Sequence, residues 1–215
     1  AILLFCIMLS GTWTTLPRHR ERIQKGLIDF IVSAVAVITF LNYNSTTISL
    51  GFTELELPKA VYAILGIILF WVSINVTNCT DGVDGLCASL CVIVMLSFGL
   101  IFKETLGTYV IANFLFSAVL LAYLYFNSSP SSMLMGDAGS RALALYCSDR
   151  HQISAPIIYI LLAGVLIIDG GLGLVKLFLK RFLKISILKN TRTPIHDHVR
   201  KKCGWSDTQV VARFL

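Results

Sequence analysis

The chain has 215 residues, of which 56% are hydrophobic and only 14% are charged, and its formal net charge is +6. Because a soluble domain carries about 25% charged residues, this composition indicates an integral membrane protein. The basic residues lie in loops beside apolar segments, which favours membrane orientation and contact with anionic lipid and argues against nucleic acid as a partner.

Apolar segments joined by short polar loops predict an all-α, polytopic transmembrane helical bundle with about seven crossings. We expect one transmembrane domain over residues 1–215, truncated at both ends. The expected crossings, in chain order, are Ala1–Trp13, Gly26–Tyr43, Pro58–Ile74, Leu86–Phe102, Thr108–Phe126, Ser140–Cys147 and Ala155–Val175. The polar segments expected to be loops or turns are Asn44–Leu57, Lys103–Gly107, Asn127–Gly139 and Ser148–Gln152.

Alternating crossings place almost all basic residues on one face of the membrane. Every Lys and Arg except Lys59, Lys103 and Arg150 falls on the face that also carries the Asn75–Gly85 segment. Basic residues collect on the cytoplasmic side, so we assign this face to the cytoplasm. On it, Lys176–Lys189 is either a basic amphipathic extension at the lipid headgroups or the end of a span with snorkelling lysines, and the sequence leaves both interpretations open.

The Asn75–Gly85 segment places four polar side chains between two long apolar runs. They are spaced by three residues: Asn75, Asn78, Asp81 and Asp84. On a helix, this spacing would direct them towards a common cleft, and Gly82 and Gly85 would let a ligand approach the backbone. A capped helix end needs only one such residue, so the pattern favours a site for a hard cation or a phosphate at the membrane surface.

Two further polar motifs belong to the same face. Asp137, between Gly136 and Gly139, is expected at the start of a helix, where a carboxylate can hold a cation that bridges to an anion. Magnesium takes oxygen ligands, few of them from protein, and Asn78 and Asp137 suit that need. His196 and His198, expected in a loop, can bind metal or donate to phosphate, or are merely solvated.

Asp169 lies within an expected span, between Ile168 and Gly170. An acid inside the membrane is by default a candidate functional residue. The alternative is a purely structural pairing with Arg141 or Asn127 inside the bundle, and the sequence does not decide between them.

Taken together and in order, these motifs resemble the polyprenyl-phosphate N-acetylhexosamine-1-phosphate transferases. The resemblance rests on Asn75-x-x-Asn78-x-Thr-Asp81-Gly-x-Asp84-Gly-Leu, Met135-Gly-Asp137-x-Gly-Ser140, Pro194-Ile-His196-x-His198 and Gly204-Trp205-Ser-x-x-Gln-Val-Val-x-Arg213-Phe214. Within that family the last two motifs look most like the phospho-N-acetylmuramoyl-pentapeptide transferases.

The resemblance implies a magnesium-dependent transferase of the bacterial inner membrane that works at the cytoplasmic face. It would move phospho-MurNAc-pentapeptide from UDP to undecaprenyl phosphate, releasing UMP and forming lipid I for peptidoglycan. Its partners would be these two substrates and membrane lipid, and the resemblance favours a homodimer. Carried over by position, the catalytic residues are Asp81, Asp137, His196 and His198, the substrate-binding residues are Asn75, Gly82, Asp84 and Asn127, and the Mg²⁺ ligands are Asn78 and Asp137.

The chain departs from the family pattern at three places. An Asp-Asp pair expected near Ser10–Thr15 is missing, the middle histidine of three is Asp197, and the aromatic residue expected two positions before Gly136 is Leu134. Three alternatives follow. One is a related transferase that uses UDP-GlcNAc, against which Gly204-Trp205 argues. The others are a catalytically impaired paralogue that acts as a binding or assembly protein, and a transporter that uses a buried acid.

Overall fold

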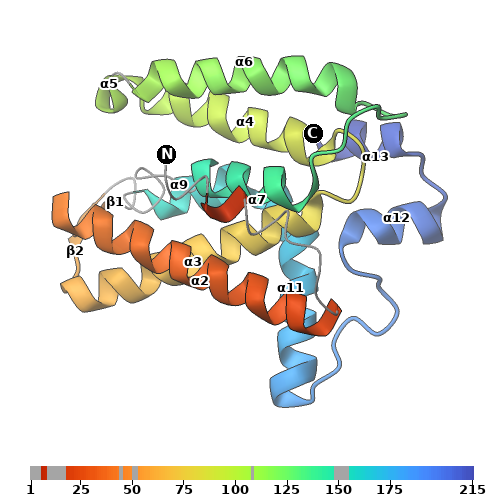
Figure 1. Cartoon of the computed structure of the whole chain (residues 1–215), viewed down its shortest axis with the longest axis horizontal. Helices are drawn as coiled ribbons and strands as arrows, with labels where there is room; N and C mark the ends of the chain where they lie inside the picture. Colours follow the sequence, from red (N-terminus) through yellow and green to blue (C-terminus); the bar gives the residue numbers. More distant parts are fainter. Residues whose placement is uncertain (1–5, 9–17, 44–45, 50–52, 108, 148–154) are drawn as a thin grey trace. The chain divides into compact units, whose positions relative to one another are not determined.

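The computed structural model describes residues 6–8, 18–43, 46–49, 53–107, 109–147 and 155–215, which form helices joined by short loops and one small hairpin (Figure 1). The expected acid-free stretch Ser10–Thr15 and the turn Ser148–Gln152 lie outside these residues. The chain divides into two units: Ala1–Asn78 with Gly136–Ile160, and Cys79–Met135 with Leu161–Leu215.

The first unit is built on two long helices, α2 (Arg18–Tyr43) and α3 (Lys59–Thr80), with α7 (Gly136–Cys147) and the start of α9 (Pro156–Leu162). Helices α2, α3 and α7 share one hydrophobic core. Its buried members are Ile7, Val32, Val37, Ile48, Tyr62, Phe70, Ile74, Ala144 and Leu145. The ring of Tyr62 stacks on that of Phe40, with 6.0 Å between centroids. The same three helices, α2, α3 and α7, also carry polar side chains. The packing of this core therefore determines where those polar side chains meet.

The segment Asn44–Leu57, expected to be a loop of an all-α protein, contains a two-stranded antiparallel sheet. Strand β1 (Thr47–Ser49) pairs with β2 (Glu54–Glu56), and Ile48 lies opposite Leu55. β-branched residues favour strands, and burial of Ile48 in the core of the first unit fixes which face of β1 points inward. The segment expected to be a loop thus contains two short strands, in a chain that is otherwise mostly helical.

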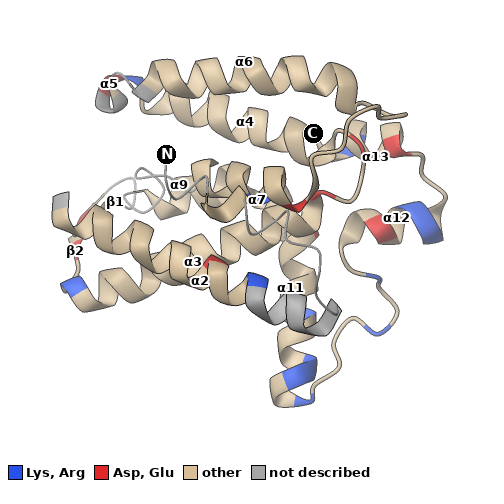
Figure 2. Cartoon of the chain, in the orientation of Figure 1, with Lys and Arg blue, Asp and Glu red and all other residues tan. Residues whose placement is uncertain are grey.

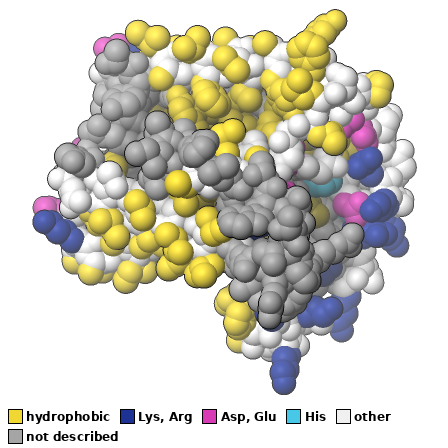
Figure 3. Space-filling model, in the orientation of Figure 1, with side chains coloured by type: hydrophobic (Ala, Val, Ile, Leu, Met, Phe, Trp, Pro, Cys, Tyr) yellow, Lys and Arg dark blue, Asp and Glu magenta, His cyan; other side chains and the backbone are white. Residues whose placement is uncertain are grey.

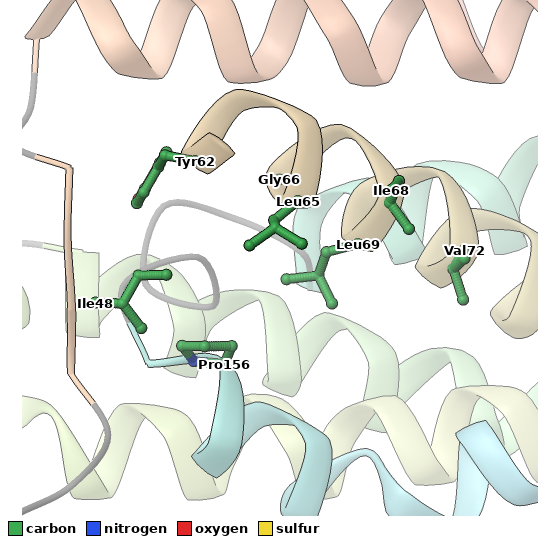
Figure 4. A pocket seen from close by; sticks show the side chains of 8 residues that line it. All are labelled: Ile48, Tyr62, Leu65, Gly66, Ile68, Leu69, Val72 and Pro156. Carbon is green, nitrogen blue, oxygen red and sulfur yellow. The ribbon is translucent and has the colours of Figure 1, made fainter. Parts of the chain in front are cut away.

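An apolar pocket of about 310 Å³ lies beside α3 in the first unit (Figure 4). Leu65, Leu69 and Val72 of α3 line it together with Ile48 of β1 and Pro156 of α9. None of the residues predicted to bind substrate or metal contributes to its wall. The pocket therefore lies among apolar side chains and is separate from the residues predicted to bind substrate or metal.

The second unit is centred on α4 (Leu86–Ile101), which is buried on most of its surface. Helix α6 (Tyr109–Asn127) packs along it after the short α5 (Lys103–Leu106), and α10 (Gly164–Leu166) and α13 (Asp207–Phe214) also contact it. Two π-helical turns, η1 (Ile167–Gly171) and η2 (Leu179–Leu183), flank α11 (Leu172–Phe178). Helix α12 (Ile195–Cys203) contacts η1.

Three described helical segments are long and apolar enough to cross a membrane: Lys25–Asn42, Lys59–Thr80 and Val110–Asn127. The bent pair Pro156–Leu162 and Gly164–Leu183 makes a fourth if it counts as one span, and α4 is a shorter apolar helix. A polytopic helical membrane protein is thus confirmed, whereas seven crossings stay a prediction.

Exposed apolar side chains cover the candidate spans. On α6 the side chains of Ile111 and Leu115 are 66% and 65% exposed, and on α3 that of Ile64 is 59% exposed. Figure 3 shows hydrophobic side chains gathered over α6, and Figure 2 shows an almost uncharged α6 ribbon. Such faces are stable against lipid hydrocarbon and unstable in water.

Basic residues collect instead at the end of α11 and on α12 (Figure 2). Within this region, Lys180 and Arg181 are exposed, as are the apolar Phe178 and Phe182, whose rings lie 4.9 Å apart. Lys176 is different, because its Nζ donates hydrogen bonds to backbone carbonyls of Leu188 and Thr191.

Candidate active site

The Asn75–Gly85 segment does not form the single helical face that its spacing predicted. Helix α3 ends at Thr80, residues 81–85 form turns, and α4 begins at Leu86. Gly85 has a φ of 81°, which only glycine adopts readily. Asn75 and Asn78 are therefore helical, whereas Asp81 and Asp84 lie in the turn. The Nδ2 of Asn75 donates to the carbonyl of Trp71, within α3.

In the first unit, Asn78 and Asp137 lie together although 59 residues separate them. The Nδ2 of Asn78 is 3.3 Å from Oδ1 of Asp137 and donates to Oγ of Ser140 at 2.9 Å. Lys25 of α2 donates from Nζ to Oδ2 of Asp137 at 2.7 Å. We call Lys25, Asn78, Asp137 and Ser140 the carboxylate cluster. Sequence reasoning anticipated the meeting of Asn78 and Asp137 but assigned no role to Ser140.

The local structure explains where the carboxylate of Asp137 sits. Gly136 has a φ of 64° and starts α7, and Asp137 follows in the first helical turn, as the sequence predicted. Partial burial acts to raise the pKa of the Asp137 carboxyl. Hydrogen bonds from Lys25 and Asn78 and the charges of Lys25 and Arg141 outweigh this, so the pKa lies below its ordinary value. Asp137 is therefore an anion that attracts cations.

The carboxylate cluster fits a magnesium ion by the chemistry of its donors. The side chain of Asp137 is 45% exposed, and the ammonium of Lys25 already places a cation on one carboxylate oxygen. Magnesium is usually held by one or two carboxylates with water and phosphate oxygens completing its shell. In the described part of the chain no three His, Cys, Asp or Glu residues gather as a metal site. A metal here would therefore depend on water and substrate oxygens.

A buried ion pair lies in the same unit. Nη1 of Arg141 donates to Oδ1 of Asp29 at 3.2 Å, and the two side chains are 6% and 0% exposed. Arg141, one of the two structural partners suggested for Asp169, thus pairs with Asp29. Asp29 is one helical turn beyond Lys25, as Arg141 is beyond Asp137, so α2 and α7 meet through two successive charge pairs.

In the second unit, the loop after α6 is held to the turn before α4. Asn127 accepts a hydrogen bond at Oδ1 from the backbone N–H of Gly85 (3.0 Å) and donates from Nδ2 to the carbonyl of Met133 (2.9 Å). Asp84 accepts at Oδ2 from the N–H of Ser131 at 3.1 Å. Asn127 thus uses its amide group within this loop and not on Asp169. The predicted substrate-binding residues Asp84 and Asn127 hold the turn and the loop together.

The predicted histidines lie on α12 and not in a loop, and they face different partners. His196 is buried and Oδ2 of Asp169 lies 2.7 Å from its Nδ1. His198 accepts at Nδ1 from the backbone N–H of Arg192 at 3.1 Å. A helix separates neighbouring positions around its circumference, which explains why two histidines so close in sequence diverge.

Helix α12 reaches the glycine turn through two side chains. A methyl group added at Gly82 would collide with Nε2 of His196. One helical turn later, Nη1 of Arg200 donates to the carbonyl of Gly82 at 3.3 Å, while Asp207 binds the same guanidinium. We call Gly82, Asp169, His196 and Arg200 the histidine cluster. Arg200 was not among the predicted site residues, although its position four residues after His196 was a usable signal.

Two departures from the family pattern have plain structural settings. Asp197 forms ion pairs with Lys201 (2.6 Å) and Arg192 (3.2 Å). The hydrogen bond from Lys201 is the main reason why the pKa of Asp197 is below its ordinary value. Leu134 is 75% exposed. Neither residue belongs to the histidine cluster.

One unit thus carries a carboxylate held by Lys25 and Asn78, and the other carries a histidine and a guanidinium beside a glycine turn. The chain belongs to glycosyl transferase family 4, whose family model matches residues 1–148.

Curated relatives carry a more specific name. The chain is 35% identical to the phospho-N-acetylmuramoyl-pentapeptide-transferase of Treponema pallidum (strain Nichols) in an alignment of 215 positions. This alignment covers 89% of the present chain and 59% of the relative. Proteins of the same name from Clostridium novyi and Carboxydothermus hydrogenoformans are 31% and 30% identical, covering 89% and 92% of this chain and 59% and 62% of their own lengths. The chain therefore spans about three fifths of these relatives.

Proposed function

We propose that this chain forms part of a magnesium-dependent enzyme that transfers phospho-MurNAc-pentapeptide from UDP to undecaprenyl phosphate. The products are UMP and lipid I, the membrane-bound precursor of peptidoglycan. The family match and the names of the relatives support a transferase of this kind. The observation that carries the proposal is the meeting of Asn78 and Asp137, because two separate family motifs converge there on one anionic site.

The chemistry of phosphoryl transfer fits the groups present. Such reactions need reactants held in line and negative charge neutralised, and little covalent work from the protein. Asn78 and Asp137 would hold Mg²⁺, which when bound supplies positive charge to the phosphate oxygens. Lys25 and Arg200 add fixed positive charge within their own units. In this proposal Asp81 positions a phosphate, Asn75, Gly82, Asp84 and Asn127 bind the nucleotide part of the donor, and His196 and His198 bind phosphates.

The location of the reaction follows from the charge distribution. We propose a multi-pass protein of the bacterial inner membrane whose polar motifs face the cytoplasm, in a topology of about seven crossings. The soluble UDP-linked donor would then reach a site at the membrane surface, while undecaprenyl phosphate arrives within the lipid. A homodimer belongs to the same proposal.

The test uses the intact protein in membranes that receive UDP-MurNAc-pentapeptide, undecaprenyl phosphate and Mg²⁺. We expect UMP release that EDTA abolishes and that Asp137→Asn reduces on the order of 10²-fold or more. Glu104→Gln is the matched control, because this carboxylate is 89% exposed on α5 and should leave the rate unchanged.

The other outcomes reject the proposal in distinguishable ways. UMP release only with UDP-GlcNAc as donor would assign a different sugar to the same chemistry. Binding of the UDP-linked donor without UMP release would favour the binding or assembly protein. An undiminished rate in Asp137→Asn would remove the carboxylate cluster from the reaction.

A further inference from the structure

Asp169 is fully buried, and both of its carboxylate oxygens are used by a single other residue. Oδ1 accepts from the backbone N–H of His196 at 2.8 Å, and Oδ2 lies 2.7 Å from Nδ1 of the same residue. Asp169 is 0% exposed and His196 is 4% exposed. An acid that fixes both the backbone and the ring of one histidine leaves that ring little rotational freedom.

The backbone around Asp169 is built to let α12 come close. Asp169 lies in the π-helical turn η1, a local feature that is frequent at functional sites. Gly170 and Gly171, which follow it, are buried. A Cβ at Gly173 would lie 3.6 Å from the side chain of Thr193, just before α12. The absence of side chains here brings His196 within hydrogen-bonding distance of the carboxylate.

The pairing decides which ring nitrogen is available. A carboxylate can only accept hydrogen bonds, so an ionised Asp169 requires the proton of His196 to be on Nδ1. Nε2 is then the nitrogen left for a ligand. It points at Gly82, which is exposed and belongs to the turn that carries Asp81 and Asp84.

We propose that Asp169 is a positioning residue that holds His196 with its proton on Nδ1 and presents Nε2 at the Gly82 turn to a phosphate oxygen. The inference rests on the proposed transferase function for its choice of ligand. When the ring is protonated on Nε2 as well, it donates from there to an oxyanion while Nδ1–H stays on Asp169. Arg200 brings a guanidinium to the same turn from the same face of α12. A histidine donor and a guanidinium beside a glycine-rich turn match a phosphate.

The first test is spectroscopic and needs no turnover. The intact protein, labelled with ¹⁵N-histidine in detergent, should show His196 protonated on Nδ1, with the signal assigned by its loss in His196→Gln. Asp169→Asn should convert this signal to the other tautomer or to a mixture, and Asp169→Glu should restore it at least in part. Addition of inorganic phosphate should shift the Nε2 resonance in the wild type and not in Asp169→Asn.

The second test is kinetic. Asp169→Asn should lower kcat for UMP release by roughly 10²-fold, with a smaller change in KM. Combined with His196→Gln it should cause no further loss, because a residue that acts through His196 has nothing left to position. A residue that only stabilises the fold would instead add its effect to that of His196→Gln.

Gly82→Ala tests the His196 ring from its Nε2 side. This variant keeps the proposal testable if Asp169→Asn does not fold. We expect it to leave the Nδ1 proton in place but to block Nε2 and lower kcat comparably. Gly164→Ala is the control, since a Cβ there meets nothing within 4 Å.

The inference is overturned if Nδ1 of His196 carries no proton, or if phosphate leaves the Nε2 resonance unmoved. Additive kinetic losses in the double variant would also overturn it. Absence of UMP release from the wild type would reject the transferase function, while the tautomer measurement would still decide the role of Asp169.

Discussion

Arg141 and Asp29 form an ion pair that is shielded from solvent at the heart of the first unit, with 3.2 Å between Nη1 and Oδ1. Removal of one partner leaves the other charge buried and uncompensated, which typically costs about 3–5 kcal/mol. We therefore expect Asp29→Asn or Arg141→Met to lower the unfolding temperature in detergent strongly.

Two comparisons make this prediction specific. The double variant Asp29→Leu/Arg141→Met should recover much of the loss, because an apolar pair of similar volume no longer buries a charge. Glu104→Gln breaks an exposed pair whose atoms are 3.8 Å apart and should have no measurable effect. Equal effects of Asp29→Asn and Glu104→Gln would contradict the structure.

Asn127 connects the Gly85 turn to the loop that follows α6. Asn127→Ala leaves the N–H of Gly85 without its side-chain partner, at a cost of about 1–3 kcal/mol, whereas the carbonyl of Met133 still accepts from the hydroxyl of Tyr123. Hydrogen exchange followed by mass spectrometry should show faster exchange across residues 128–135. Asp84→Ala should release mainly the N–H of Ser131.

The control for this loop is Ser128→Ala. Ser128 is exposed and its Oγ bonds only within its own helix end, to the carbonyl of Leu124. Exchange across the loop should therefore stay at the wild-type rate. Unchanged exchange in Asn127→Ala would show that the loop is held by other contacts.

Sequence reasoning succeeded where local chemistry decides the structure. Long apolar runs predicted α3 and α6, and a glycine followed by an acid predicted the start of α7 at Asp137. The meeting of Asn78 with Asp137 followed from two motifs that belong to one face and to one kind of ligand. These inferences needed only composition, spacing and the properties of helix ends.

It failed where distant parts of the chain decide the structure. The sequence suggested Arg141 or Asn127 as the partner of Asp169, because no feature of the neighbouring sequence shows that α12 packs on a π-helical turn. On a helix, Asp81 and Asp84 would have shared a face with Asn75 and Asn78, but residues 81–85 form turns. Both carboxylate oxygens of Asp169 bind His196, whereas a residue of an open proton path would face water. Asp169, the residue that suggested a transporter, therefore no longer supports that interpretation.

Gly85 adopts a φ of 81°, and we expect its replacement by alanine to strain the turn before α4. A left-handed conformation costs a residue with a Cβ roughly 1–2 kcal/mol. The space around it is not the limit, since the nearest atoms to an added Cβ would be 3.8 Å away. Gly85→Ala should therefore lower the unfolding temperature modestly, and Gly164→Ala should not lower it. A turn that tolerates alanine without loss would not have this backbone conformation.

Asp197 should titrate below the ordinary aspartate pKa of 3.8, chiefly because Lys201 donates a hydrogen bond to it. Since its pKa is lower in the folded than in the unfolded protein, the stabilisation of α12 is present above the ordinary value. It is lost as the pH falls through the lowered folded value. Carboxyl ¹³C NMR of the protein in detergent measures this directly. Lys201→Met should move the pKa of Asp197 back towards 3.8, whereas Lys202→Met, one position further along α12, should not. A wild-type value at or above 3.8 would show that the ion pairs with Lys201 and Arg192 do not persist in solution.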